Sequence, residues 1–416
     1  MNELMISSLV FSLTYGVLLL DKLPKVAVVT LGAAVMLLIH HHHAAHLLHH
    51  IDIPVLLLLA GMMMMVHLTG QQGVFNHLTA ALLNIAKGRI WLLFVLMMGV
   101  IAFLSAWLDN VTTVLLMVPL VFSSCRSLGI SPLPFLMGSI LFSNIGGTAT
   151  LVGDPPNLLI ASGAKLGFND FIRELTPIVV VVFTAVMALV LVWYRRALFV
   201  KPTDEATLTA PTPSPIRWKG WVCLTVLMIS FLGFLTHPLH HIEPYIIATL
   251  GAGILLLLEG NTEAIHAIEW QTIVFFVGLF VLVGGVVEAG MVRWLAEHLL
   301  ALTQGDPTTT TLGLLWGSGM LSGIVDNIPY TATMIPLVQG LVEHGLPSHA
   351  LWWALSLGAC LGGNATLVGA AANIIVAELA EKEGVPISFS QFLLLGLSST
   401  AIALALSSIY LVWRYL

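Results

Sequence analysis

Charged side chains are scarce in this chain. Asp, Glu, Lys and Arg make up 9% of its 416 residues, whereas 58% of the residues are hydrophobic. Soluble domains carry about 25% charged residues, so this composition excludes an ordinary soluble protein. The formal net charge of -6 provides no basic surface for nucleic acid, and we expect no nucleic-acid partner.

Cysteine is equally rare, and several catalytic motifs are missing. The three cysteines stand singly in apolar sequence, which argues against a disulfide framework or a thiolate metal site. No Gly-rich phosphate loop of the Walker type occurs, so the chain by itself is not predicted to be an ATP-driven pump. We see no nucleophile and base arrangement, and we predict that the protein is not an enzyme. None of the 15 Lys and Arg residues falls in the middle of an apolar run.

Long apolar runs dominate what is present. About 20 apolar residues in a helix cross the hydrocarbon core of a bilayer. Ten such runs occur, near 4–20, 24–39, 53–69, 133–163, 177–198, 219–236, 244–259, 271–287, 350–379 and 392–415.

Two further apolar runs, 90–124 and 311–343, are each interrupted by an Asp-Asn pair. Irregular backbone at membrane depth must be shielded from lipid, so each run is predicted to be a re-entrant helical hairpin with its polar tip buried in protein.

An internal repeat relates the two halves of the chain. A shift of 217 positions places Asp109 on Asp326 and Asn110 on Asn327. A shift of 216 then aligns the run from Gly146 to Gly153 with the run from Gly362 to Gly369. Because each half contains five spans and one hairpin, the second half must enter the membrane in the opposite orientation.

The predicted fold is therefore an all-α polytopic membrane protein made of two inverted repeats. The first repeat covers residues 1–199, with the hairpin 90–124 and a broken helix 133–163. The second covers 219–416, with the hairpin 311–343 and a broken helix 350–379.

The distribution of basic residues predicts the orientation. Residues 200–218 are a Pro/Thr-rich linker flanked by basic residues, which the positive-inside rule places in the cytoplasm. The N-terminus is then outside, in a multi-pass protein of the cell inner membrane. The shorter amphipathic segments 74–86 and 291–303 are predicted to lie along the membrane interface.

Three aspartates stand out as candidate functional residues: Asp109, Asp326 and Asp154. An ionised Asp at the bilayer centre costs about 2.5–3.5 kcal/mol, so such residues usually line a substrate path. The alternative is that Asp109 and Asp326 only cap the helices that follow them. The residue equivalent to Asp154 in the second half is the uncharged Ala370. Replacement of Asp154 is therefore expected to be less damaging than replacement of Asp109 or Asp326.

Polar residues inside the broken helices form the second candidate element. Paired Gly and Thr weaken a helix and free backbone carbonyls, which suit a small hard cation together with hydroxyl and amide oxygens. Close helix packing through small residues would explain the glycines but not Asn144, Thr148 or Asn364. The Pro155-Pro156 pair also favours a break in the first repeat.

The strings Asp109 to Thr113, Gly146 to Asn157 and Leu361 to Asn373 resemble signatures of the ion transporter superfamily. They are most similar to its arsenite-permease and NhaD-type sodium/proton antiporter branch, to which P protein-like and citrate transporter-like domains are also similar. The resemblance implies a divalent anion/sodium symporter-like elevator fold, often dimeric, so a homodimer is expected. It also implies ion sites between each hairpin tip and the adjacent broken helix.

Carried onto this chain, the resemblance and the repeat define one set of candidate ion-binding and substrate-binding residues. They are Ser105, Asp109, Asn110, Thr112, Thr113, Asn144, Gly147, Thr148, Thr150, Asp154, Asn157, Ser322, Asp326, Asn327, Thr331, Gly363, Asn364, Thr366 and Asn373. Asp109, Asn110, Asp326 and Asn327 are the expected metal-ion ligands.

The sequence predicts a secondary active transporter, and sodium/proton antiport is the favoured function. Desolvation favours the protonated form of a carboxyl group, which lets a proton and a cation compete for one site. No cofactor is expected; sodium ions and protons are the expected transported or coupling ions, and membrane lipids the surrounding partners. The alternative is an anion or oxyanion transporter, for example one for arsenite extrusion or for sodium-coupled dicarboxylate or citrate transport. A channel-like conductance is a third possibility.

Overall fold

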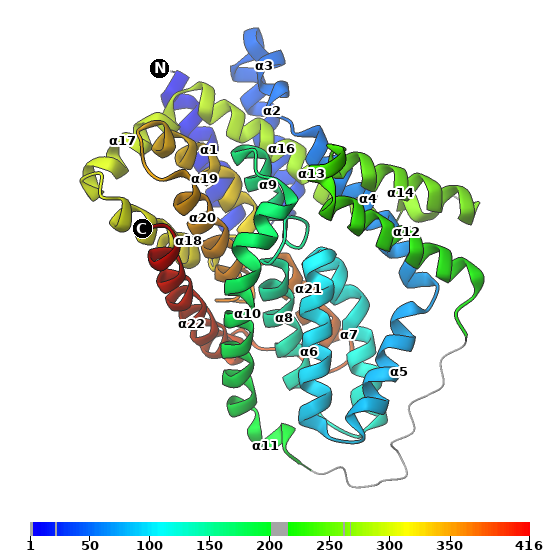
Figure 1. Cartoon of the computed structure of the whole chain (residues 1–416). Coiled ribbons are helices and arrows are strands. Elements are labelled where there is room, and N and C mark those ends of the chain that lie inside the picture. Colours follow the sequence, from blue (N-terminus) through cyan, green and yellow to red (C-terminus); the bar gives the residue numbers. More distant parts are fainter. Residues whose placement is uncertain (1–2, 21–22, 201–214, 261–262, 267) are drawn as a thin grey trace.

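The structure is a computed structural model that describes residues 3–20, 23–200, 215–260, 263–266 and 268–416. Its regular elements are helices throughout these ranges, which confirms the predicted all-α membrane fold (Figure 1). Most of the linker predicted over 200–218 lies outside the described residues.

The helices of the first half are α1 (Glu3–Leu20), α2 (Lys25–Ile39), the 3-10 helix η1 (His41–His43), α3 (Ala44–His49), α4 (Ile53–Gln71), α5 (Val74–Ala86), α6 (Ile90–Trp107), α7 (Asn110–Ser127), α8 (Leu133–Gly147), α9 (Pro155–Ala164), α10 (Phe168–Trp193) and α11 (Arg195–Leu198). Those of the second half are α12 (Trp218–Leu235), α13 (His237–His240), α14 (Pro244–Glu259), α15 (Glu263–His266), α16 (Trp270–Glu288), α17 (Met291–Thr303), α18 (Pro307–Ser322), α19 (Asn327–Glu343), α20 (Ser348–Gly362), α21 (Ala371–Lys382) and α22 (Phe389–Tyr415).

The helix boundaries repeat with the period found in the sequence. Moving α4 by 217 positions gives 270–288, the bounds of α16, and moving α5 gives 291–303, the bounds of α17. Gly73 and Gly290 precede α5 and α17 with φ of 75° and 81°, a left-handed conformation that favours glycine. Figure 1 shows α5 near the lower end of the molecule and α17 near the upper end, as inverted repeats require.

Length and apolar character make several helices able to cross a membrane. Among the described residues, seven helices of at least 18 residues are apolar enough to do so: α4, α6, α7, α10, α12, α16 and α22. Shorter apolar helices include α2, α8 and α14. The hairpins predicted over 90–124 and 311–343 appear as the helix pairs α6–α7 and α18–α19. Each is joined by a short tip, after Trp107 and after Ser322.

The two broken helices form the centre of the molecule. In α8 every residue from Pro134 to Gly147 is buried, and in α20 every residue from Ala350 to Gly362 is buried. A helix that is apolar on all sides packs inside a protein. α8 ends at Gly147 and α9 begins at Pro155, whereas α20 ends at Gly362 and α21 begins at Ala371. The irregular backbone of both breaks is thereby shielded from lipid.

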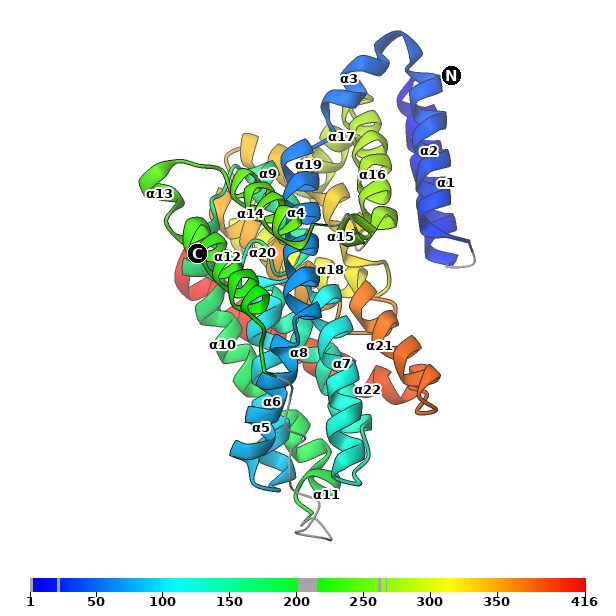
Figure 2. The same cartoon turned by 90° about the vertical axis from the view of Figure 1, so that its right-hand side faces the viewer.

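Two outer groups of helices flank this centre. On one side α2 packs against α16 and α1, and on the other α4 packs against α14 and α12. Figure 2 shows α1, α2 and α16 on one side of the molecule, and the hairpin helices α6 and α7 in its lower part. The placement of α5 and α17 along the membrane interface stays a prediction.

The inverted arrangement makes a testable prediction about topology. Ser127 and His344 are exposed, end corresponding hairpins, and should face opposite sides of the membrane. We expect Ser127→Cys and His344→Cys to react with an impermeant maleimide from opposite sides of oriented vesicles. The native cysteines Cys125, Cys223 and Cys360 are buried, so unmodified protein is the control for background labelling. Labelling of both variants from one side would contradict the inverted repeat.

Candidate ion-binding site

The first hairpin tip is closed by Asp109, the N-cap of α7. Its carboxylate accepts the Thr112 N–H at 2.8 Å and the Thr112 hydroxyl at 2.5 Å. Asp109 is 6% exposed. The capping function that the sequence left open is therefore present, and it occupies both carboxylate oxygens through a single neighbour.

The second hairpin tip is closed by Asp326 in the corresponding position. Asp326 accepts the Ile328 N–H at 3.2 Å, and it also forms an ion pair with Lys25, whose Nζ lies 3.0 Å from Oδ2. Lys25 is the first residue of α2, so a lysine at the edge of an apolar run reaches a hairpin tip. The sequence does not reveal this contact, because the partners are 301 positions apart and no local pattern connects them.

Each tip is bound to its neighbouring broken helix by hydroxyl groups at corresponding positions. Ser105 Oγ donates to the Ser143 carbonyl at 2.6 Å, and Ser322 Oγ donates to the Ala359 carbonyl at 2.6 Å. A second pair repeats the symmetry: Thr150 donates to the Ala106 carbonyl, and Thr366 donates to the Gly323 carbonyl at 2.6 Å.

Glycines let the hairpins approach the broken helices closely. A Cβ atom on Gly146 would lie 2.1 Å from the Ala102 carbonyl oxygen, and one on Gly362 would lie 2.6 Å from the Gly319 carbonyl oxygen. Both distances are far below van der Waals contact, so a larger residue would force the helices apart. The paired glycines therefore allow the hairpins to pack closely against the broken helices, and they also weaken those helices at the breaks.

Asparagines hold the broken segments in shape. Asn157 Nδ2 donates to the Thr148 and Thr150 carbonyls at 3.1 Å and 2.9 Å. Asn373 Nδ2 donates to the Gly363 and Thr366 carbonyls at 2.7 Å and 2.9 Å. These bonds satisfy backbone groups that the interrupted helices leave without a helical partner.

Asp154 lies where the two repeats meet. It is fully buried, and its carboxylate accepts from Asn110 Nδ2 at 3.2 Å and from Asn327 Nδ2 at 3.3 Å. Asn110 and Asn327 follow the aspartates of the two hairpin tips. Asp154 occupies the N-cap position of α9, yet its described contacts include no side-chain cap hydrogen bond. Helix capping therefore does not account for this carboxyl group, and the geometry makes it the most central of the three aspartates.

A chain of amides extends from Asp154 across the centre. Asn110 Nδ2 also donates to Asn144 Oδ1 at 3.1 Å. Asn144 Nδ2 in turn donates to Asn364 Oδ1 at 2.9 Å and to Asn373 Oδ1 at 2.8 Å. The two broken helices are thus joined by buried polar groups that satisfy one another.

Two buried hydroxyl groups near the tips are left without a partner. Within the described part of the chain, Thr113 Oγ1 and Thr331 Oγ1 have no hydrogen-bond partner, and both residues are fully buried. Each belongs to the first turns of the second hairpin helix, close to Asn110 and Asn327. A buried polar atom without a partner is costly and calls for an explanation such as an ion or a water molecule.

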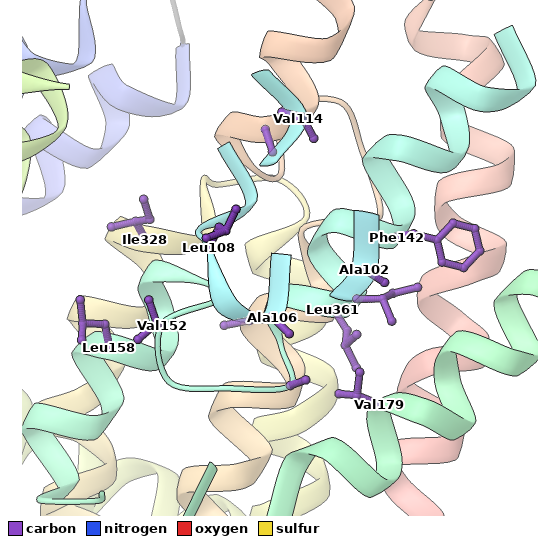
Figure 3. Close-up of a cluster of buried hydrophobic side chains, with 14 of the residues drawn as sticks. Ala102, Ala106, Leu108, Val114, Phe142, Val152, Leu158, Val179, Ile328 and Leu361 are labelled. Carbon is purple, nitrogen blue, oxygen red and sulfur yellow. The ribbon is translucent and has the colours of Figure 1, made fainter. Parts of the chain in front are cut away.

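Buried apolar side chains lie next to the tips and the first break. Figure 3 shows Leu108 and Ile328, which flank the two tips, together with Val152 from the first break. All three residues are buried. Low polarity around the carboxyl and amide groups strengthens every electrostatic interaction among them.

The predicted site residues therefore fall into two sets. Asp154, Asn110, Asn327 and the amides of the broken helices meet at the centre, whereas Asp109 and Asp326 each close a tip. Carboxylate, amide, hydroxyl and carbonyl oxygens are ligands that suit a small hard cation. In the described ranges, no group of three or more His, Cys, Asp or Glu side chains is placed to hold a metal ion.

Buried polar groups, hairpin tips and broken helices inside an apolar helical body define a multi-pass membrane transporter. The fold matches that of the YdaH transporter of Alcanivorax borkumensis, which has an unusual topology, with a TM-score of 0.64 over 99% of this chain and 98% of that one. At 15% identity, this likeness shows the shared fold.

Residues 15–358 match the citrate transporter family (CitMHS), and the chain belongs to this family. It is 40% identical over 420 residues to the 46 kDa membrane protein of Mycobacterium leprae, covering 98% of both chains. It is 44% identical over 363 residues to the uncharacterized transporter Rv2684 of Mycobacterium tuberculosis, covering 84% of this chain and 83% of that one. The human P protein is 31% identical over 83% of this chain and 52% of its own length. The predicted resemblance is confirmed, and the protein is a transporter rather than an enzyme.

Proposed function

We propose that the protein is a cation/proton antiporter, with sodium as the cation, and that Asp154 is the group that exchanges the two. One observation carries this proposal. A fully buried carboxyl group lies between the asparagines of both hairpin tips and is not used as a helix cap. A carboxyl group inside the membrane is energetically costly, and one without a structural role is taken to be functional.

The exchange follows from the chemistry of a buried carboxyl group. With no cation present, the low-dielectric surroundings favour a proton on the carboxyl group. A bound cation makes the ionised form favourable and expels the proton. The amides of Asn110 and Asn327 point Nδ2 toward Asp154; rotation by half a turn would present Oδ1 to a cation instead. The unpartnered hydroxyl groups of Thr113 and Thr331 would complete the oxygen ligands.

A difference between the two repeats supports alternating access. In this mechanism the hairpins and broken helices move against the outer helices. A cavity of about 810 Å³ lies beside the first hairpin and is lined by Thr79, Ser123, Arg217 and Lys219. In the second repeat the residues equivalent to Thr79 and Ser123 are Ala296 and Gly340, which pack closely: a Cβ on Gly340 would lie 3.1 Å from the Ala296 Cβ. The first hairpin therefore lies beside a cavity, whereas the equivalent residues of the second repeat pack closely. A difference of this kind is expected of one state of an elevator-type transporter.

Transport by the purified protein in vesicles tests the proposed function. We expect an inward sodium gradient to drive protons out of the vesicle lumen, followed with a trapped pH-sensitive dye. Potassium chloride at equal ionic strength, and empty vesicles, are the controls. Absence of sodium-dependent proton movement, in vesicles that contain folded protein, would contradict antiport.

Transport of a carboxylate or oxyanion is the second candidate function, and two observations favour it. The family is described as a citrate transporter family, and Lys25 brings a positive charge to the second tip. However, this charge is opposed by the Asp326 carboxylate, which lies 3.0 Å from the Lys25 Nζ. Uptake of labelled citrate or succinate in the same vesicles, measured with and without sodium, tests this candidate. Uptake above the level of empty vesicles would support anion transport.

A further inference from the structure

The two hairpin tips differ in one charge. Asp109 and Asp326 correspond under the 217-residue shift, and each caps the helix that follows. Asp326 also has the ammonium group of Lys25 at 3.0 Å. Residues 30–33 of α2 match residues 249–252 of α14, a shift of 219, so the residue equivalent to Lys25 in the second repeat is Pro244, which has no charge. The Asp109 side chain accepts hydrogen bonds from the Thr112 N–H and hydroxyl. The two repeats therefore differ at the tip where pseudo-symmetry predicts a second cation.

Lys25 lines a cavity next to the second tip. Lys25, Asp326 and Ala371 line one cavity of about 820 Å³, together with residues of α2 and α16. Ala371 begins the helix that follows the second break, so the cavity lies next to both elements that would form a second ion site. The Lys25 side chain is 26% exposed and that of Asp326 is 10% exposed. Partial burial weakens screening by solvent and makes this pair more than a surface contact.

An ammonium group and a sodium ion satisfy the same carboxylate in the same way. Each brings a single positive charge, and two such charges near one carboxylate repel each other. As long as Lys25 stays on Asp326, the binding of a second monovalent cation at this tip gains little free energy. At the first tip no lysine is needed to exclude a cation, because the N–H and hydroxyl of Thr112 already engage both carboxylate oxygens of Asp109.

We propose that Lys25 is a built-in cation that takes the place of a transported ion at the second tip, so that the chain binds one sodium ion, at Asp154, rather than two. This inference deepens the proposed function and rests on it. It makes Lys25 a residue that sets the ion stoichiometry, and it explains why only one tip carries a lysine although both carry an aspartate.

Counting bound ions tests the inference directly. We expect equilibrium binding of radioactive sodium to purified protein to saturate at about one ion per chain. Lys25→Gln should raise this number to about two, because Asp326 becomes available. The double variant Lys25→Gln/Asp326→Asn should return it to about one, and Lys25→Arg should leave it at one.

A matched control comes from another lysine at the start of an outer helix. Lys219 pairs with Glu259 at 3.3 Å and lies in α12, the first long helix of the second repeat. Lys219→Gln removes an ion pair of the same kind away from the tips and should leave one bound ion. A change in this control equal to that of Lys25→Gln would contradict a specific role for Lys25.

The outcomes separate the inference from the proposed function. Two ions on the unmodified protein, or one ion on folded Lys25→Gln, would overturn the role of Lys25 and leave antiport intact. No bound sodium on any folded variant would overturn the proposed function itself. If Lys25→Gln does not fold, as judged by size-exclusion chromatography, the count on the unmodified protein still decides: one ion supports the inference and two ions overturn it.

Discussion

Replacing Asp154 with asparagine is expected to abolish sodium/proton exchange while the protein still folds. The amide keeps the size and polarity of the side chain, and its oxygen can still accept from Asn110 and Asn327. It cannot release a proton or balance the charge of a cation. Exchange measured in vesicles with a pH-sensitive dye should fall to the level of empty vesicles. Symmetry alone predicts a milder effect, because the residue equivalent to Asp154 in the second repeat is the uncharged Ala370. The structure shows instead that Asp154 lies at the centre of the site.

An exposed aspartate gives a matched control for this substitution, and Asp109 gives a comparison. Asp306 is exposed and caps α18 through the Thr309 N–H at 2.7 Å. Because asparagine caps helices about as well as aspartate, Asp306→Asn should leave exchange unchanged. Asp109→Asn should also keep its cap, and we expect reduced but measurable exchange. Normal exchange by folded Asp154→Asn protein would show that this carboxyl group is structural.

Replacing Gly153 with alanine is expected to weaken sodium binding and slow transport by displacing the first tip from its broken helix. A Cβ at this position would lie 2.5 Å from the Ser105 carbonyl oxygen and 2.6 Å from the Gly147 carbonyl oxygen. Both are backbone atoms, which cannot move away without shifting the helices. Overpacking of this kind costs about 1–3 kcal/mol. If that cost falls on the bound state, sodium affinity drops by roughly five-fold to 150-fold.

A glycine in the first hairpin provides the control. Gly99 lies in α6, and a Cβ there would meet nothing within 4 Å. Gly99→Ala should leave sodium affinity unchanged, and thermal unfolding of both variants would show whether Gly153→Ala remains folded. Sodium affinity of folded Gly153→Ala equal to that of the Gly99→Ala variant would contradict a role for this close approach.

The repeated elements could be predicted because their signals are local. An Asp-Asn pair in the middle of an apolar run indicates an interruption, and the glycine and threonine motif from Gly146 onward indicates a break. The helix boundaries on either side of Asp109 and Gly147 follow from these signals. Gly73 and Gly290 recur at the same shift because both precede corresponding helices in a left-handed conformation.

The grouping of the site residues could not be predicted in the same way. Asp154 meets Asn327 across 173 positions, and Asn144 meets Asn364 across 220. Such contacts depend on how the two repeats dock, which hydrophobic periodicity does not determine. The shift of 217 predicts equivalence between tips, but it cannot indicate a residue that breaks the symmetry. Lys25 and Asp154 both break it.

Proton release on sodium binding is the measurement that tests the central claim most directly. If a proton and sodium compete at Asp154, adding sodium chloride to weakly buffered, purified protein near neutral pH should release about one proton per chain. Potassium chloride should release fewer, and Asp154→Asn should release none. Release of the same number of protons from folded Asp154→Asn, or no release from the unmodified protein while it binds sodium, would contradict exchange at this carboxyl group.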